Sequence, residues 1–184
     1  MGRAARFLAA AFLLAGCEDS EDEAFRPPDD PGYATITYPG GHPLDWVSDN
    51  SSTLAHEDEV LKLVNGYRVA MGRNALVHDP ALRRCARGHS RHMRADVHAF
   101  YAHVNPEGDD PGIRLWRNGV AWTTLGENLV AGPADPLFAF NSWLGSPGHR
   151  ANLEDPRWIR TGVGYQPGTG APSHDAYWTE VFAD

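Results

Sequence analysis

Two short motifs flank a predicted helix in this sequence, Gly126-Glu127-Asn128-Leu129 and Ser146-Pro147-Gly148-His149-Arg150-Ala151-Asn152-Leu153. Between them, Pro133 to Pro136 open a helical pattern whose apolar positions are Leu137, Phe138, Phe140, Trp143 and Leu144. Ser146 falls at the end of that helix. Because only Pro147-Gly148 separates Ser146 from His149, a turn there could bring the two side chains together.

Helices come first in the chain and strands come last. Helical periodicity begins at Leu54 and stops at Gly72, and a second helix follows Pro80. Near the C-terminus, 161–165 and 177–182 alternate as strands do, and a Gly- and Pro-rich loop between them favours an antiparallel hairpin. This order predicts an α+β fold with helices packed on a mainly antiparallel sheet.

The second predicted helix carries residues that invite a functional interpretation. His89 lies on its apolar face and His92 flanks that face, so the pair need not converge on one metal ion. A packed, hydrogen-bonded His89 is therefore favoured over a metal ligand. Cys85 lies beside Ala86 in the same helix and is interpreted as a small packed hydrophobe rather than a catalytic thiol.

The N-terminus has the composition of an export signal. Arg3 and Arg6 precede an apolar run that is shorter than the roughly 20 residues a membrane span needs. Residues 1–16 are therefore predicted to be a signal peptide. The run ends in Leu14-Ala15-Gly16-Cys17, which resembles the lipobox of bacterial lipoproteins. That resemblance implies that Cys17 is lipidated and becomes the new N-terminus, with a simple secretory signal as the alternative.

The segment 17–53 is acidic and then rich in Pro, Gly and Asp, which predicts a tether between the lipid and a domain at 54–184. With Cys17 lipidated, Cys85 has no disulfide partner, because the chain has only two cysteines. The net charge of −8 argues against a nucleic-acid partner. The expected location is the cell envelope, outside the cytoplasm and attached to a membrane through Cys17.

From Leu54 onward, the sequence resembles the CAP superfamily (cysteine-rich secretory proteins, antigen 5 and pathogenesis-related 1 proteins), in its bacterial SCP-domain form. The resemblance rests on several short segments that occur in the family's order. They are Val64-Asn65 with Tyr67-Arg68, Pro80-Ala81-Leu82, Tyr101-Ala102-His103, Gly126-Glu127-Asn128-Leu129, Ser146 to Leu153, Gly162-Val163-Gly164 and Tyr177-Trp178 with Val181-Phe182.

The resemblance implies a three-layer α-β-α sandwich with a cleft that carries two His and two Glu. In this sequence His103 matches the first His, Glu127 the first Glu and His149 the second His. Ser146 is nearest to the position of the second Glu, so the four-residue set is incomplete. Glu127 could contact a ligand or metal, or brace loops through hydrogen bonds. Glu180 could complete the site, although a solvated carboxylate at a sheet edge is the favoured interpretation.

Two kinds of chemistry would suit these residues. His103, His149 and Glu127 could bind Zn²⁺ and leave a fourth position for water. Alternatively, Ser146 could act as nucleophile with His149 as base and Glu127 as orienting group, although no nucleophile elbow is present. Against the serine mechanism, Ser146 could simply be a helix-end residue bonded to local backbone.

The leading functional hypothesis is a non-enzymatic binding module that uses a cleft formed by His103, Glu127, Ser146 and His149. The resemblance implies ligands such as sterols, other lipids, envelope glycans or a partner protein. A metal-dependent or serine hydrolase acting on peptides or esters is the first alternative. A purely structural envelope protein is the second.

Overall fold

The computed structural model describes residues 51–95, 101–168 and 174–184. The predicted signal peptide, Cys17 and nearly all of the predicted tether lie outside the described residues. Within them, the helices are α1 (Ser51–Ala70), α2 (Pro80–Ala95), α3 (Pro111–Arg117), α4 (Pro136–Gly145) and α5 (Pro147–Glu154). The strands are β1 (Val77–His78), β2 (Leu125–Gly132), β3 (Arg160–Pro167) and β4 (Ala176–Ala183).

The strands form one sheet in the order β1-β3-β4-β2. Strands β3 and β4 pair antiparallel, as do β2 and β4, whereas the two residues of β1 pair parallel with β3. The predicted C-terminal hairpin is therefore confirmed. Strand β4 is central and β2 is the edge strand that carries Glu127.

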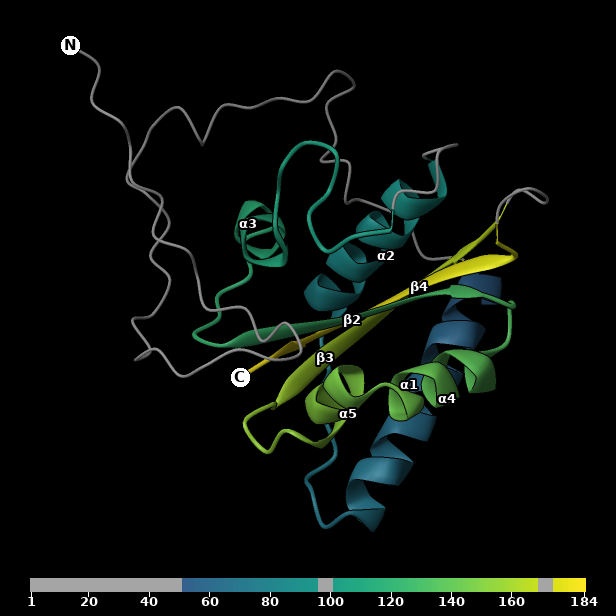
Figure 1. The fold of residues 1–184 in the computed structure, drawn as a ribbon. Coiled ribbons are helices and arrows are strands. Elements are labelled where there is room, and N and C mark those ends of the chain that lie inside the picture. The colour runs from purple at the N-terminus through teal and green to yellow at the C-terminus, as the bar shows by residue number, and fades with distance from the viewer. Residues whose placement is uncertain (1–50, 96–100, 169–173) are drawn as a thin grey trace.

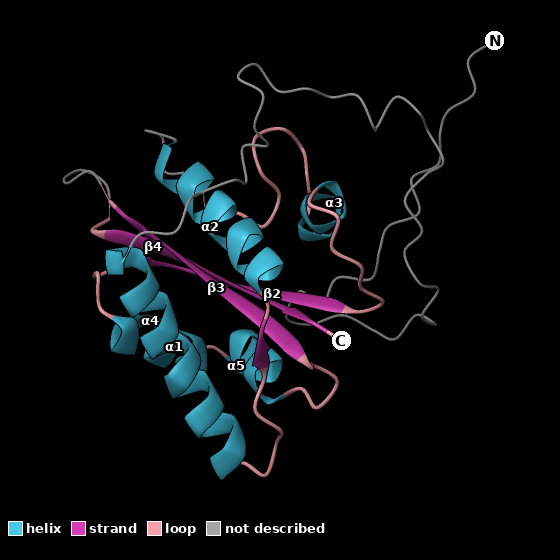
Figure 2. Ribbon diagram, turned by 180° about the vertical axis from the view of Figure 1, so that it is seen from behind, coloured by secondary structure: helices cyan, strands magenta, loops and turns pink. Residues whose placement is uncertain are grey.

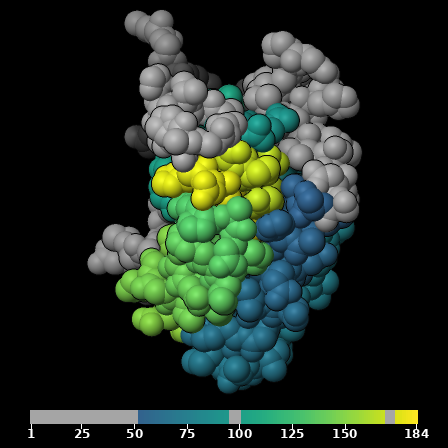
Figure 3. Space-filling view, turned by 90° about the vertical axis from the view of Figure 1, so that its right-hand side faces the viewer, coloured from purple at the N-terminus to yellow at the C-terminus, as the bar shows by residue number. Residues whose placement is uncertain are grey.

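Helices cover both faces of this sheet, which confirms the three-layer α-β-α arrangement. Helix α2 lies on one face with α3 near it, and α1, α4 and α5 lie on the other (Figures 1 and 2). In Figure 3, α1 (blue) lies beside the segment that includes α4 (green), on the face of the sheet opposite α2. The largest apolar cluster lies beneath these helices and includes Trp143, Trp158, Trp178 and Phe182. None of the described helices is long and apolar enough to cross a bilayer.

Helix α1 begins earlier than the periodicity predicts. It starts at Ser51, so the last three residues of the predicted tether are helical. Thr53 is buried, which gives this first turn a reason to be ordered. Glu57 on the same helix accepts hydrogen bonds from Arg87 Nε at 2.6 Å and from the Tyr165 backbone N–H at 3.1 Å. This buried carboxylate thus connects α1 to α2 and to β3.

Two glycines of β3 allow α2 to approach the sheet closely. A Cβ on Gly162 would lie 2.1 Å from the Arg83 backbone nitrogen, and one on Gly164 would lie 2.2 Å from the Ala86 carbonyl carbon. The Gly162-Val163-Gly164 motif is therefore required for close contact between backbones. This packing fixes α2, and with it His89, above the sheet.

Candidate functional site

Glu127 is the buried centre of the candidate site. It pairs with Val181 of β4, and alternation along the strand directs its side chain to the α2 face of the sheet. Its side chain is 2% exposed. Glu127 lies on the edge strand β2, and it braces the neighbouring segment through a hydrogen bond with His103, as one of the two sequence-based interpretations expected.

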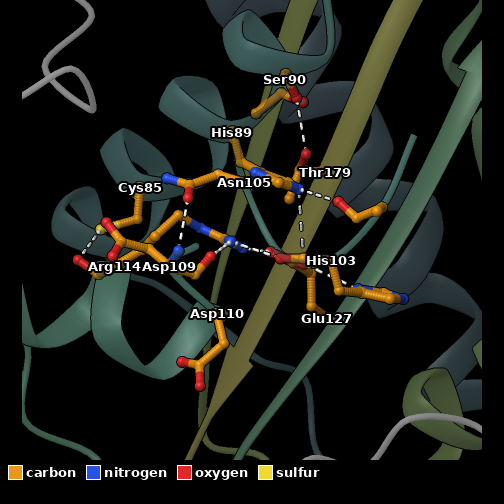
Figure 4. A network of polar contacts seen from close by, with 12 residues as sticks. Cys85, His89, Ser90, His103, Asn105, Asp109, Asp110, Arg114, Glu127 and Thr179 are labelled. Carbon is orange, nitrogen blue, oxygen red and sulfur yellow. Dashed lines mark hydrogen bonds and ion pairs between the residues drawn. The ribbon is translucent and has the colours of Figure 1, made fainter. Parts of the chain in front are cut away.

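His103 and Arg114 bind the two carboxylate oxygens of Glu127 (Figure 4). His103 Nδ1 lies 2.9 Å from Oε1, and Arg114 Nη2 contacts Oε2. His103 comes from the segment between α2 and α3, and Arg114 comes from α3. The His103 side chain is 28% exposed, so it connects the buried carboxylate to the surface.

The surroundings of Glu127 keep its carboxyl group ionised. Burial alone would raise its pKa, but the charge of Arg114 and the hydrogen bond with His103 oppose burial, and the pKa is lowered to about 2. A carboxylate in this state only accepts hydrogen bonds. It therefore forms a buried, charge-assisted pair with the Arg114 guanidinium.

His89 contacts the backbone next to His103 and lies close to Glu127. It is fully buried on α2, and its Nε2 donates to the Ala102 carbonyl oxygen at 2.9 Å. The same nitrogen lies 4.0 Å from Glu127 Oε1. Burial, followed by the charge of Arg114, lowers the pKa of His89 to about 3, so the ring is neutral. The prediction of a packed, hydrogen-bonded histidine is confirmed, and its bond holds the backbone next to His103.

His149 reaches the site from the opposite layer. It lies on α5, which two asparagines attach to the edge strand β2. Asn128 Nδ2 donates to the His149 carbonyl oxygen at 3.1 Å, and Asn152 Nδ2 donates to the Glu127 carbonyl oxygen at 3.3 Å. Burial and the nearby charge of His103 lower the pKa of His149. Both histidines are thus attached to β2, His103 through the Glu127 side chain and His149 through its backbone, and they lie near enough for the charge of one to act on the other.

Ser146 separates α4 from α5. Its backbone N–H donates to the Trp143 carbonyl oxygen at 3.2 Å, and its carbonyl oxygen accepts from Arg150 N–H at 2.8 Å. Its hydroxyl makes no capping hydrogen bond to α5. The helix-end position is therefore as predicted, whereas within the described part of the chain the Ser146 side chain does not cap α5.

Neither predicted catalytic arrangement is assembled in the part of the chain that the structure describes. Among the described residues, no group of three His, Cys, Asp or Glu side chains is placed to hold a metal ion. In the predicted zinc site of His103, Glu127 and His149, the two Glu127 oxygens contact His103 and Arg114, so the carboxylate lies beside the His103 ring rather than in an open ligand position. For the same reason Glu127 orients His103 and not His149, so the predicted triad of Ser146, His149 and Glu127 is not formed.

Glu180 does not belong to this site. The expectation of a solvated carboxylate at a sheet edge is wrong, because β4 is central and Glu180 is fully buried. It faces the α1 layer, where Thr161 Oγ1 donates to its Oε1 at 3.2 Å. Burial raises the pKa of Glu180 to about 8.

Arg114 and Asn152 are the site residues that sequence reasoning missed. Asn152 belongs to the motif that follows Ser146, but the motif alone does not show that it contacts β2. Arg114 lies between Ile113 and Leu115 in a short helix that Asp110 caps. An arginine between two apolar residues is the only signal the sequence offers for a buried guanidinium.

The chain belongs to the cysteine-rich secretory protein family, whose CAP domain model matches residues 61–182. This confirms the family that the sequence motifs indicated. Uncharacterized protein YkwD of Bacillus subtilis (strain 168) is 30% identical over 136 residues, which are 74% of this chain and 50% of YkwD. This chain thus spans half the length of that relative.

Two solved structures share the fold. An extracellular protein containing an SCP domain from Bacillus anthracis has a TM-score of 0.63 at 26% identity, and the match covers 74% of this chain and 44% of that one. An outer surface protein from Borrelia burgdorferi has a TM-score of 0.63 at 18% identity, over 74% of this chain and 96% of that one. The second likeness concerns the fold alone.

Proposed function

We propose that this protein is an exported, lipid-anchored CAP domain that binds a ligand, without turning it over, at the surface formed by His103 and His149. The observation that carries the proposal is the state of Glu127. Its carboxylate is buried and engaged on both oxygens, by His103 and by Arg114. It therefore acts as a brace that holds the His103 imidazole at the surface, and His149 on α5 would supply the second imidazole of the proposed binding surface.

The segment around His103 offers ligand contacts of two kinds. The His103 ring is partly exposed and polar, whereas Tyr101 and Val104 are exposed and largely apolar, at 51% and 46%. Ligand sites in proteins combine apolar and aromatic side chains with a few precisely placed polar groups. An amphipathic ligand, such as an envelope lipid, a glycan or a segment of a partner protein, would use both.

The N-terminal segment, and not the site around His103, supports export and lipid anchoring. The charged and apolar N-terminus followed by Leu14-Ala15-Gly16-Cys17 supports a cleaved signal peptide and lipid on Cys17. The related Bacillus anthracis structure is of an extracellular protein, which agrees with export. A lipidated Cys17 would hold the domain on an envelope membrane through the segment that precedes α1.

A hydrolase is the second candidate, and the His103–Glu127 hydrogen bond favours it. A carboxylate that orients an imidazole is one part of a general-base system. We rank hydrolysis lower because Ser146 and His149, the predicted nucleophile and base, have no hydrogen bond to this pair among the described residues.

A turnover screen tests the proposal against this alternative. The purified protein is incubated with peptide and ester substrates, with and without added Zn²⁺, beside His103→Ala and Ser146→Ala variants. We expect no turnover that depends on His103 or on Ser146. Turnover by the wild type that is lost in His103→Ala would overturn the non-enzymatic proposal, and loss in Ser146→Ala would restore the serine mechanism.

A further inference from the structure

Arg114 bridges two elements of the site. Its Nη2 contacts Glu127 Oε2 on β2, and its Nη1 donates to the carbonyl oxygen of His103 at 2.6 Å and to that of Asp109 at 3.1 Å. The guanidinium is 2% exposed. One buried side chain therefore fixes both the carboxylate that binds the His103 ring and the backbone that carries it (Figure 4).

We infer that Arg114 is a positioning residue that decides which ring nitrogen of His103 carries the proton, and hence which ligand groups His103 accepts. This inference deepens the proposed function and rests on His103 being a ligand-facing residue. It concerns a residue that would not itself touch the ligand. The contacts of its guanidinium described above are to Glu127 and to the backbone of the 103–109 segment.

Donor and acceptor roles determine where the ring proton lies. A carboxylate paired with a guanidinium only accepts hydrogen bonds, so at the 2.9 Å contact His103 Nδ1 must be the donor. In the neutral ring the proton then sits on Nδ1, which leaves Nε2, on the other side of the ring, as a bare acceptor. His103 would therefore bind ligand groups that donate, such as hydroxyl, amide N–H or ammonium groups.

Without Arg114, the direction of the hydrogen bond between His103 Nδ1 and Glu127 can reverse. A buried carboxyl group with no cationic partner favours its protonated form. A protonated Glu127 can donate to Nδ1, and the ring proton then resides on Nε2. His103 would now offer a donor to the ligand instead of an acceptor, so the loss of Arg114 would change ligand preference and not merely weaken binding.

Arg117 provides a matched control in the same helix. It pairs with Asp109 and so supports the same segment, but none of its described contacts is with Glu127. Arg117→Gln therefore removes a neighbouring ion pair and leaves the Glu127–His103 contact in place. Arg114→Lys is a second control, because a cation remains next to Glu127.

The experiment is ¹⁵N NMR of the histidine rings of the ligand-free protein at pH 8. We expect protonated Nδ1 and bare Nε2 at His103 in the wild type, in Arg117→Gln and in Arg114→Lys. Arg114→Gln should shift the tautomer ratio toward Nε2–H by about tenfold, the effect of one lost hydrogen bond to a charged group. Nε2–H in the wild type, or an unchanged ratio in folded Arg114→Gln, would overturn the inference.

If Arg114→Gln does not fold, the same NMR measurement on Glu127→Gln provides a second test. Arg114 donates only, so it should hold the amide oxygen of the new side chain and turn the amide NH₂ toward His103 Nδ1. We therefore expect Nε2–H in Glu127→Gln, and persistence of Nδ1–H would contradict the role of Arg114. No ligand is present in these measurements, so their outcome is independent of whether the proposed binding function is correct.

Discussion

Glu127 and Glu180 are both buried in the same sheet, on opposite faces, and their pKa values move in opposite directions. Glu127 pairs with Val181, so the adjacent Glu180 points to the other face. Burial acts on both, but the Arg114 contact lowers the pKa of Glu127 to about 2, whereas the pKa of Glu180 rises to about 8. One carboxyl is thus charged and the other neutral near pH 7.

Glu180 should make the protein less stable at alkaline pH. Its pKa is 4.5 in the unfolded chain and about 8 when folded, so the folded state binds the proton more tightly. Stability from this group is full below pH 4.5 and is lost as pH rises to about 8. We therefore expect Glu180→Gln, measured by urea unfolding, to be more stable than the wild type at pH 8 by about 1 kcal/mol or more.

The difference between Glu180→Gln and the wild type should shrink at pH 5, where both side chains are neutral. Glu57, whose pKa burial also raises, is present in both proteins and cancels from the comparison. Arg68 is the cation that interacts with Glu180 and opposes the effect of burial. If Glu180→Gln is equally destabilised at both pH values, Glu180 is not a buried neutral acid.

Glu127→Gln should destabilise the protein by about 3 kcal/mol at pH 7, because the buried Arg114 loses its charged partner. The pKa of Glu127 is lowered from 4.5 to about 2 on folding, so its contribution is present above pH 4.5 and is lost as pH falls toward 2. Urea unfolding of both proteins at pH 7 and pH 3 measures this. A difference that is the same at both pH values would contradict the ionised, paired state of Glu127.

Gly162→Ala should be severely destabilising, by about 3 kcal/mol or more, because overpacking here displaces backbone rather than a flexible side chain. The added Cβ would lie 2.1 Å from the Arg83 backbone nitrogen. Gly145→Ala is the matched control, since nothing lies within 4 Å of a Cβ there. Thermal unfolding of both variants measures this difference in stability. Similar melting temperatures would show that α2 and β3 are not in close contact.

Lipidation can be tested without any assay of function. Cells that express the protein are labelled with an alkyne-bearing fatty acid, and the protein is recovered and examined for label. We expect label on the wild type, because Cys17 follows a lipobox-like segment, and no label on Cys17→Ser. Cys85→Ser should keep the label. Label that persists in Cys17→Ser would contradict the proposed anchor.

The elements that the sequence predicted well are those with clear local patterns. The helix after Pro80, the helix before Ser146 and the C-terminal hairpin all have periodic apolar residues. Strand β1 has only two residues, and β2 is interrupted by Glu127 and Asn128, so neither has the periodicity of a strand. Their pairing depends on contacts between segments that are distant in sequence.

The sequence predicted only part of the candidate site, because the site also depends on contacts between segments that are distant in sequence. Motif order identified His103, Glu127 and His149, but the contacts among them depend on how three layers meet at one strand. The error at Glu180 arose because alternation reveals which residues share a face but not where a strand lies in the sheet. The role of Arg114 could not be predicted, since only the fold places α3 against β2.

Calorimetry on matched histidine variants measures whether His103 and His149 form a ligand-binding surface. A panel of palmitate, a sterol, a muropeptide and anionic lipid vesicles is titrated by calorimetry into the wild type and into His103→Ala, His149→Ala and His174→Ala. His174 is an exposed histidine beside the far end of β4, so it serves as control. We predict that a ligand bound by the wild type loses about tenfold or more in affinity, about 1.4 kcal/mol, in the first two variants only. Equal affinity in all four proteins would show that His103 and His149 do not form the binding surface.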